Sequence, residues 1–200
     1  MKPRHFEEVC HDRPSILAPI RPEKPKPVYP GRLTFYPPTS SGSGAAARFE
    51  LRLNAQDEEQ YDCFFLEMAA HKAGGRGEGP ASFDWHRRLT VKLGFLDICE
   101  MLLVLEGHKD RIGADHAQGL YHQTDDSNTV IEFRRDPKGG GFLLGLSRKG
   151  RSANAEVTRI GMCLTDAEAV GLRCMFQSGL FFMTFHRNLR PRSARFANAP

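Results

Sequence analysis

The chain has 200 residues with a net charge of +4, and 40% of its residues are hydrophobic. This length and composition suit a globular protein of one or two domains and exclude a collagen-like chain, a coiled-coil rod and a small disulfide-bonded scaffold. The five cysteines are odd in number and include no Cys-x-x-Cys pair. That usage favours a reducing compartment over a disulfide framework.

No targeting or membrane segment stands out in the sequence. The first fifteen residues lack the apolar stretch of a signal peptide. The longest apolar run, Phe95–Leu105, contains Asp97 and Glu100 and is too short to span a bilayer. We therefore expect a protein of the cytoplasm, associated with a nucleoid, or of an organelle matrix. We expect neither secretion nor a membrane partner.

Both ends of the chain differ in composition from the middle. Residues 1–30 are rich in proline, which favours extended chain and prevents regular helix. Residues 187–200 carry four arginines and no acidic residue. We predict an N-terminal arm, a domain over residues 31–186 and a basic C-terminal tail. Within the domain, one unit at about 31–107 precedes a second at about 118–186.

The first unit is predicted to contain four strands and a helix. Apolar and charged residues alternate in Arg48–Asn54 and in Arg87–Leu93, the pattern of half-buried strands. Leu33–Tyr36 and Tyr61–Lys72 are apolar segments bounded by turn residues, and we predict strands there as well. Phe95–Glu106 is predicted to be a helix.

The second unit is predicted to repeat the same order. Its strands are expected at Leu120–Gln123, Thr129–Arg135, Phe142–Lys149 and Val157–Leu164, with a helix at Thr165–Phe182. Thr165 and Glu168 have the spacing of a capping box at the start of that helix. The two strand–helix junctions align at an offset of 71 residues. The aligned pairs are Leu89 with Ile160, Val91 with Met162, Leu93 with Leu164, and Asp97 with Glu168. The order of elements therefore predicts an internal repeat.

The two predicted helices are apolar around most of their circumference. A helix of this kind must be buried on more than one face, and a sheet covers only one. We therefore predict a homo-oligomer that assembles through the helices, with small residues at the closest approach. The predicted interface residues are Leu102, Val170, Gly171, Cys174 and Ser178. The alternative is that the two helices pack against each other within one chain.

The order of elements resembles the Whirly family of single-stranded nucleic-acid-binding proteins, whose fold is shared by kinetoplastid mitochondrial guide-RNA-binding proteins. The resemblance covers residues 32–186 and includes the strand, capping box and helix of VTRIGMCLTDAEAVGLRCMFQ at 157–177. That segment also resembles the end of the PC4-type single-stranded-DNA-binding unit. The Lys-Gly-Lys-Ala-Ala-Leu signature of plant Whirly proteins is absent. The resemblance implies an α+β fold of two β-β-β-β-α units, with two antiparallel four-stranded sheets, assembled into a tetramer.

Basic and aromatic residues on the predicted strands and loops are the candidate site. Binding of a single strand needs cations for the phosphates and exposed rings for the bases. The expected cations are Arg48, Arg52, Arg88, Lys92, Arg134, Arg148, Lys149 and Arg151. The expected rings are Tyr36, Trp85, Tyr121 and His122, with Phe35 and Phe83 as further candidates. For each arginine the alternative is an ordinary solvated position, and Trp85 has a core position as its alternative.

No motif in the sequence indicates an enzyme. The eight histidines form no His-Glu-x-x-His pattern, and the three glycines at 139–141 fit a hairpin turn better than a phosphate loop. His5, Cys10 and His11 form only a weak candidate metal site. We predict a non-enzymatic protein without cofactor or metal that binds single-stranded DNA in preference to RNA, with low sequence specificity. The alternative is a scaffold subunit of a larger nucleoprotein complex.

Overall fold

The structure is a computed structural model that describes residues 31–36, 44–53, 62–72, 82–114, 119–152 and 154–185. The predicted arm, the basic tail and the weak candidate metal ligands of the arm lie outside the described residues. In the described part, the predicted order of strands and helices is present throughout.

Sheet 1 is formed by the first unit and is antiparallel, with its strands in chain order. The strands are β1 (Arg32–Phe35), β2 (Ala45–Arg52), β3 (Cys63–Ala70) and β4 (Leu89–Leu93). The short 3-10 helix η1 (Trp85–Arg87) precedes β4, and helix α1 (Phe95–Leu105) follows it. Alternate residues of β4 are buried, as the sequence pattern predicts.

Sheet 2 repeats this arrangement in the second unit. Its antiparallel strands are β5 (Leu120–Gln123), β6 (Ser127–Arg135), β7 (Phe142–Gly150) and β8 (Val157–Leu164), and helix α2 (Asp166–Phe185) follows. The predicted bounds of β5 and β8 agree with the structure, and α2 ends three residues later than predicted. The predicted α+β fold, with two four-stranded antiparallel sheets and two helices, is confirmed.

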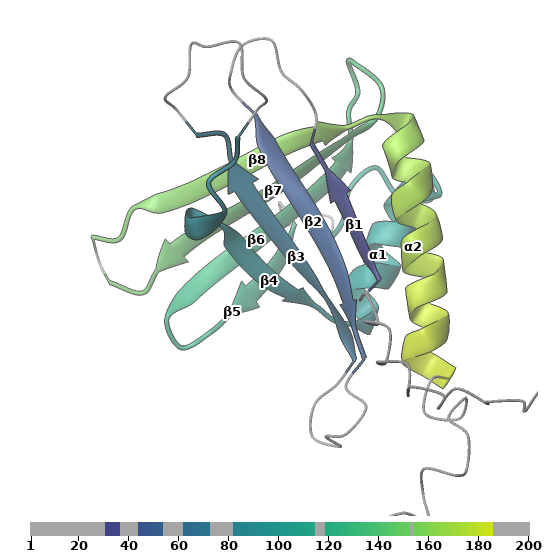
Figure 1. Ribbon diagram of the computed structural model, residues 1–200, viewed down its shortest axis with the longest axis horizontal. Helices are drawn as coiled ribbons and strands as arrows, with labels where there is room; N and C mark the ends of the chain where they lie inside the picture. Colours follow the sequence, from purple (N-terminus) through teal and green to yellow (C-terminus); the bar gives the residue numbers. More distant parts are fainter. Residues whose placement is uncertain are drawn as a thin grey trace, which may run out of the picture.

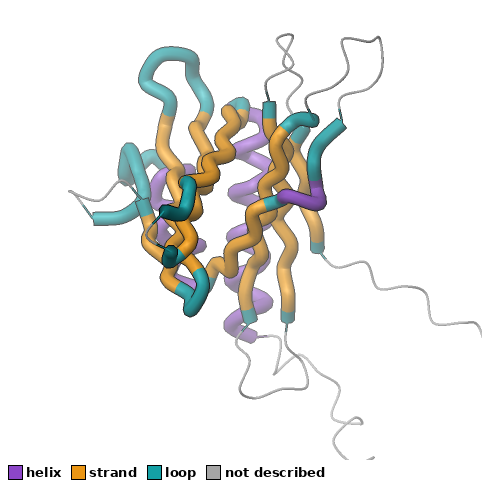
Figure 2. The backbone as a smooth tube through the Cα atoms, turned by 90° about the vertical axis from the view of Figure 1, so that its left-hand side faces the viewer, coloured by secondary structure: helices purple, strands orange, loops and turns teal. Residues whose placement is uncertain are grey.

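The strands of sheet 1 cross those of sheet 2, and the two helices lie together on one side of the sheets (Figures 1 and 2). Strand β8 contacts β2 and β3, so the sheets meet at their inner faces. The helices also contact each other. The side chain of Gln177 on α2 donates a 2.9 Å hydrogen bond to Glu106 at the end of α1. The alternative arrangement, in which the helices pack together within one chain, is thus present.

Helix α2 of the second unit packs against sheet 1 of the first. The Phe176 ring lies between those of Phe49 and Phe64, at centroid distances of 5.4 and 5.3 Å in edge-to-face geometry. Gly179 lies directly against Phe64, because a Cβ atom there would be 2.2 Å from the ring. The buried residues of both units form one continuous core. Each unit therefore depends on the other for its core.

Each helix begins with an acidic side chain that accepts a hydrogen bond from the backbone N–H three residues earlier, and the two starts are 71 residues apart. In α2 the Thr165 N–H donates to the Glu168 carboxylate at 2.8 Å, and the Glu168 N–H donates to the Thr165 hydroxyl at 3.2 Å. In α1 the Gly94 N–H donates to the Asp97 carboxylate at 2.8 Å. The predicted capping box is confirmed, and the aligned acidic residues of the two units have the same role.

The outer surface of α2 is largely apolar in the single chain. Of the residues predicted at an oligomer interface, four are exposed: Val170, Gly171, Cys174 and Ser178. Near the end of the helix, the rings of Phe181, Phe182 and Phe185 are 51%, 42% and 46% exposed. Leu102 was predicted wrongly as an interface residue: it is buried in the core of the chain, because α1 packs on both the sheets and α2.

Candidate nucleic-acid interface

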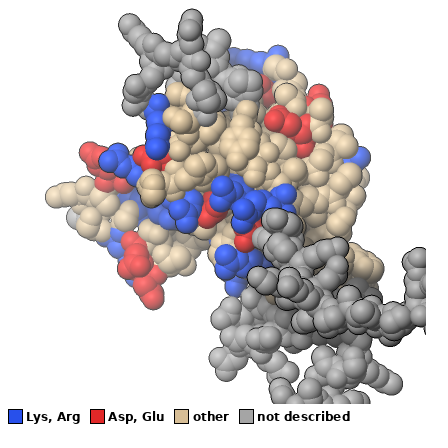
Figure 3. All heavy atoms as spheres, viewed as in Figure 1, with Lys and Arg blue, Asp and Glu red and all other residues tan. Residues whose placement is uncertain are grey.

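The outer side of sheet 1, which we call face 1, carries four of the eight predicted cations, Arg48, Arg52, Arg88 and Lys92. Strand pairing places Arg48 opposite Glu67, and Arg32 opposite Glu50. Because side chains alternate along a strand, these residues share one side of the sheet while Phe49 and Phe64 point into the core. Lysines and arginines form a band across this face, with acidic residues between them (Figure 3).

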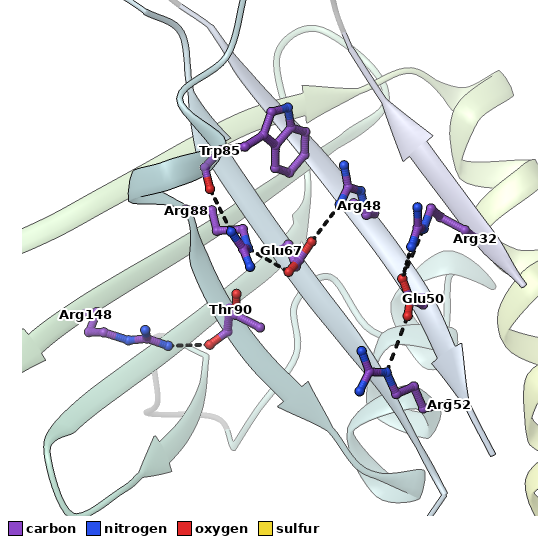
Figure 4. A network of polar contacts seen from close by, with 9 residues as sticks. All are labelled: Arg32, Arg48, Glu50, Arg52, Glu67, Trp85, Arg88, Thr90 and Arg148. Atoms are coloured by element: carbon purple, nitrogen blue, oxygen red, sulfur yellow. Dashed lines mark hydrogen bonds and ion pairs between the residues drawn. The ribbon is translucent and has the colours of Figure 1, made fainter. Parts of the chain in front are cut away.

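Each of two carboxylates on face 1 holds a pair of guanidinium groups (Figure 4). Glu67 accepts hydrogen bonds from Arg48 at 3.0 Å and from Arg88 at 2.7 Å. Glu50 accepts from Arg32 and, at 3.4 Å, from Arg52. Each cluster has one negative and two positive charges, so it keeps a net charge of +1 while its arginines are held in place.

The electrostatics of Glu50 reflect this pairing. Burial raises the pKa of its carboxyl, but the hydrogen bonds and charges of Arg32 and Arg52 outweigh burial, and the pKa is lowered. The carboxylate therefore stays ionised and continues to orient both arginines. Arg32 was not predicted as a site residue. The strand register identifies it, since it lies directly opposite Glu50.

Aromatic rings lie among the cations of face 1. The Arg48 guanidinium lies 4.2 Å from the centroid of the Trp85 ring, which is partly buried. Tyr36 is 50% exposed and packs against Phe83, with centroids 5.6 Å apart. Phe65 was not among the predicted rings, and its ring lies 5.0 Å from the Arg52 guanidinium. The apolar sequence of β3 gives no signal for it, and only the strand register, which sets Phe65 opposite Glu50 and Lys92, places it on face 1.

The outer side of sheet 2, face 2, carries a second group of predicted residues. Tyr121 is 58% exposed and shares a row across the sheet with Val130, Ser147 and Arg159. Arg134 and Lys149 are exposed on the same face. Arg159 was not predicted, although it follows from the alternation of β8.

Among the other predicted cations, Lys92 is exposed on face 1, and Arg151 is exposed just after β7.

Two predicted site residues, His122 and Arg148, point to the inner side of sheet 2, because they share its buried row with Thr129. His122 Nε2 lies 3.3 Å from the Asp97 carboxylate. That hydrogen bond raises the pKa of His122 more than burial lowers it, and the charge of Asp97 adds to the rise. The prediction that this ring faces bases on the outer surface is wrong.

Arg148 joins the two sheets. Its guanidinium donates to the Thr129 hydroxyl at 3.0 Å and to the backbone carbonyl of Thr90 on β4. Burial lowers the pKa of this side chain. Because its two hydrogen bonds connect β6 and β4 within the chain, the prediction that it lies on a free basic surface is wrong.

Comparison with known proteins supports the architecture. No family model and no curated protein matches the sequence. Among solved structures, WHY3 from Arabidopsis thaliana matches with a TM-score of 0.63 and 18% identity, covering 86% of this chain and 98% of that one. The plant transcriptional regulator PBF-2 matches with a TM-score of 0.62 and 16% identity, covering 88% and 92%. The chain has the Whirly fold. WHY1 from Arabidopsis thaliana shares this Whirly fold at a TM-score of 0.59 and 18% identity, covering 86% and 96%.

Two other kinds of site, a metal centre and a membrane-spanning helix, are not found among the described residues. Within them, no group of three or more histidine, cysteine, aspartate or glutamate side chains is placed to hold a metal ion. None of the helices in the described ranges is long and apolar enough to cross a membrane. Exposed or partly buried rings lie beside cations on face 1, and Tyr121 is exposed on face 2.

Proposed function

We propose that the protein binds single-stranded nucleic acid, DNA in preference to RNA, through faces 1 and 2 of a homo-oligomer. The observation that carries this proposal is the placement of rings beside cations on face 1. Trp85 lies against Arg48, and Phe65 lies against Arg52. Phosphates need the cations, and unstacked bases need the rings.

The charge arrangement on face 1 supports binding to phosphates. The clusters centred on Glu50 and Glu67 each retain one excess positive charge, and Lys92 is exposed nearby on the same face. Side chains already held in place lose less conformational freedom when they meet a ligand. Recognition of this kind reads no base edge, which agrees with low sequence specificity.

The apolar surface of α2 supports self-association. Val170 and the rings at the end of the helix are exposed in the single chain, and apolar surface of this extent marks an interaction site. We propose a second copy of the chain as the occupant, and a tetramer as the final assembly. Light scattering should give four times the monomer mass. A stable monomer of 22.5 kDa at micromolar concentration would contradict this proposal.

Substitution at Gly171 tests the same surface. This residue is exposed, and a Cβ atom there would meet only Leu33, at 4.0 Å. A Gly171→Glu change should therefore leave the single chain folded while placing a charge at the apolar contact between copies. We expect a lower mass by light scattering with native circular dichroism. An unchanged tetramer would exclude this helix face as the contact.

Fluorescence anisotropy tests nucleic-acid binding directly. A labelled oligo-dT, a duplex of equal length and an RNA of the same sequence are titrated with the protein. We expect oligo-dT to bind most tightly, with a slope of log K against log salt steeper than about −2, since each phosphate contact contributes roughly −0.7. Absence of binding, or a flat salt response, would contradict the proposal. Either result would favour the scaffold function, for which the exposed α2 surface offers a partner site.

A further inference from the structure

Face 2 has a hollow at its centre, over a row in which two of three paired residues are glycines. Strand pairing sets Glu132 on β6 opposite Gly145 on β7, and Gly145 opposite Gly161 on β8. The hollow over this row has a volume of about 300 Å³. The outward side chains that surround it are Glu132, Arg134, Leu143 and Cys163.

Packing within the chain does not require either glycine. A Cβ atom at Gly161 would meet its nearest neighbour, the Leu144 carbonyl oxygen, at 3.7 Å. At Gly145 the nearest atom would be the Glu132 Cβ, at 3.6 Å. Both distances are ordinary van der Waals contacts. Glycine weakens a strand, and two paired glycines without a packing reason mark a place where another group approaches the backbone.

Glu132 differs from the carboxylates of face 1. Glu50 and Glu67 each hold two guanidinium groups, whereas Glu132 has no hydrogen-bond or ion-pair partner among the described residues. It is exposed and lies beside the hollow, with its Oε2 atom 3.8 Å from the position of a Gly145 Cβ. It is also the one carboxylate on the outward positions of β5–β8, all of which the structure describes. An unpaired negative charge repels phosphate, so its presence on a nucleic-acid-binding face calls for another role.

We propose that this hollow holds one nucleobase and that Glu132 selects guanine there. The proposal rests on the function proposed above and adds base preference at one position. The Watson–Crick edge of guanine presents two adjacent donors, N1–H and the N2 amino group, and a carboxylate offers two parallel acceptors. The same edge of adenine, cytosine or thymine has no such adjacent pair. Leu143 and Cys163 supply apolar contact for the base, and Arg134 is placed to meet a flanking phosphate.

Anisotropy with three oligonucleotides tests the base preference. The probes are oligo-dT, the same strand with one central guanine, and the same strand with inosine, which lacks the N2 amino group. We expect the guanine strand to bind about tenfold more tightly than oligo-dT, as for other bidentate base contacts. The inosine strand should bind at least about threefold less tightly than the guanine strand, because one hydrogen bond is missing.

Three variants separate the role of Glu132 from general charge effects. Glu132→Gln should bind oligo-dT at least as well as the wild type but lose the preference for guanine. Glu156→Gln, an equal charge change at another exposed acidic residue, should keep the preference. Gly145→Val should fill the hollow and abolish the preference while oligo-dT still binds. If Gly145→Val does not fold, Glu132→Gln decides.

The outcomes separate the guanine site from the proposed binding of single-stranded nucleic acid, on which it rests. If no oligonucleotide binds, the proposed function fails and the guanine site fails with it. If oligo-dT binds but the wild type does not prefer guanine, only the guanine site is overturned. The same conclusion holds if Glu132→Gln retains the preference.

Discussion

The side-chain amide of Gln177 donates a 2.9 Å hydrogen bond to the carboxylate of Glu106, and the two residues are 71 positions apart. The same offset separates the first residues of the two helices, Phe95 and Asp166. Equivalent positions of two related units meet only near the axis that relates them. The contact therefore places the axis of the internal repeat between α1 and α2, and it explains why each helix reaches the other unit.

Gly179 should tolerate no side chain, because of its contact with Phe64. A Cβ atom would lie 2.2 Å from the ring, and the ring is fully buried. We expect Gly179→Ala to lower the free energy of unfolding by about 1–3 kcal/mol, the usual cost of overpacking a core. Chemical denaturation followed by circular dichroism measures this change.

A smaller residue at position 64 provides the control for that prediction. Phe64→Leu alone should destabilise the protein by leaving a cavity. Combined with Gly179→Ala it should cost less than the sum of the two single changes, since the new methyl group then has room. Strict additivity would show that the ring is not what excludes a side chain at Gly179.

Strands were predictable where alternation reflects burial on one side, as in β4, or where an apolar segment lies between turn residues. Val157–Leu164 and Leu120–Gln123 have the predicted bounds. Ala46 and Ala69 are exceptions to the rule that only one side of a strand is buried. They are paired on the outer side of sheet 1, yet both are fully buried. Alanine occurs on both the buried and the exposed side of a strand. Its position in an alternating pattern therefore does not show whether another part of the chain covers it.

The candidate site was less predictable, because polar side chains often have structural partners. His122 and Arg148 have the residue types of a binding surface, but their partners, Asp97 and Thr90, lie in the other unit. No local pattern encodes such contacts. Phe65 is the opposite case, a residue that was not predicted but lies on the candidate site. Its apolar side chain suggests a core position, yet it lies on face 1 beside Arg52. The register across strands, which the sequence does not state, decides each case.

The pairing of His122 with Asp97 should make stability depend on pH. The pKa of His122 is raised above its ordinary value of 6.5, so the folded state binds this proton more tightly than the unfolded state does. The stabilisation is complete below about pH 6.5 and is lost as the pH rises through the folded-state pKa. Unfolding free energies of the wild type and His122→Gln should differ by about 0.5–1 kcal/mol more at pH 5.5 than at pH 8.5. An equal difference at both pH values would contradict this assignment.

Neutralising Glu67 should strengthen binding of a single strand. In the Glu67→Gln variant, Arg48 and Arg88 lose their shared counter-charge, although the amide oxygen can still accept a hydrogen bond. We expect tighter binding of oligo-dT, and a salt slope steeper by about 0.7 for each guanidinium that reaches a phosphate. Anisotropy titrations over a range of salt concentrations measure both quantities.

Arg88→Ala is the opposing control for that substitution. It should weaken binding and flatten the salt slope, because it removes a cation that is 45% exposed on the same face. If neither variant changes the affinity, phosphates do not lie on face 1, and face 2 becomes the principal site.

Discrimination between single and double strands should depend on exposed rings. Phosphate charge cannot provide it, because a duplex carries more charge per unit length than a single strand. A duplex hides its base faces, whereas a single strand offers them for stacking. Tyr121 is exposed on face 2, and Trp85 lies beside Arg48 on face 1. Replacing both with alanine should cost about 2–6 kcal/mol in affinity for oligo-dT, at one stacked base for each ring.

The duplex supplies the reference for this double variant, since its weaker binding should be nearly unchanged. Native circular dichroism and an unchanged mass by light scattering must accompany the loss, because Trp85 also supports the position of Arg48. The single variants then divide the effect between the two faces. If the double variant is folded and binds oligo-dT as tightly as the wild type, these rings do not stack on bases. Single-strand selectivity would then have to come from the remaining rings of face 1, Phe65 beside Arg52 and Tyr36 packed against Phe83.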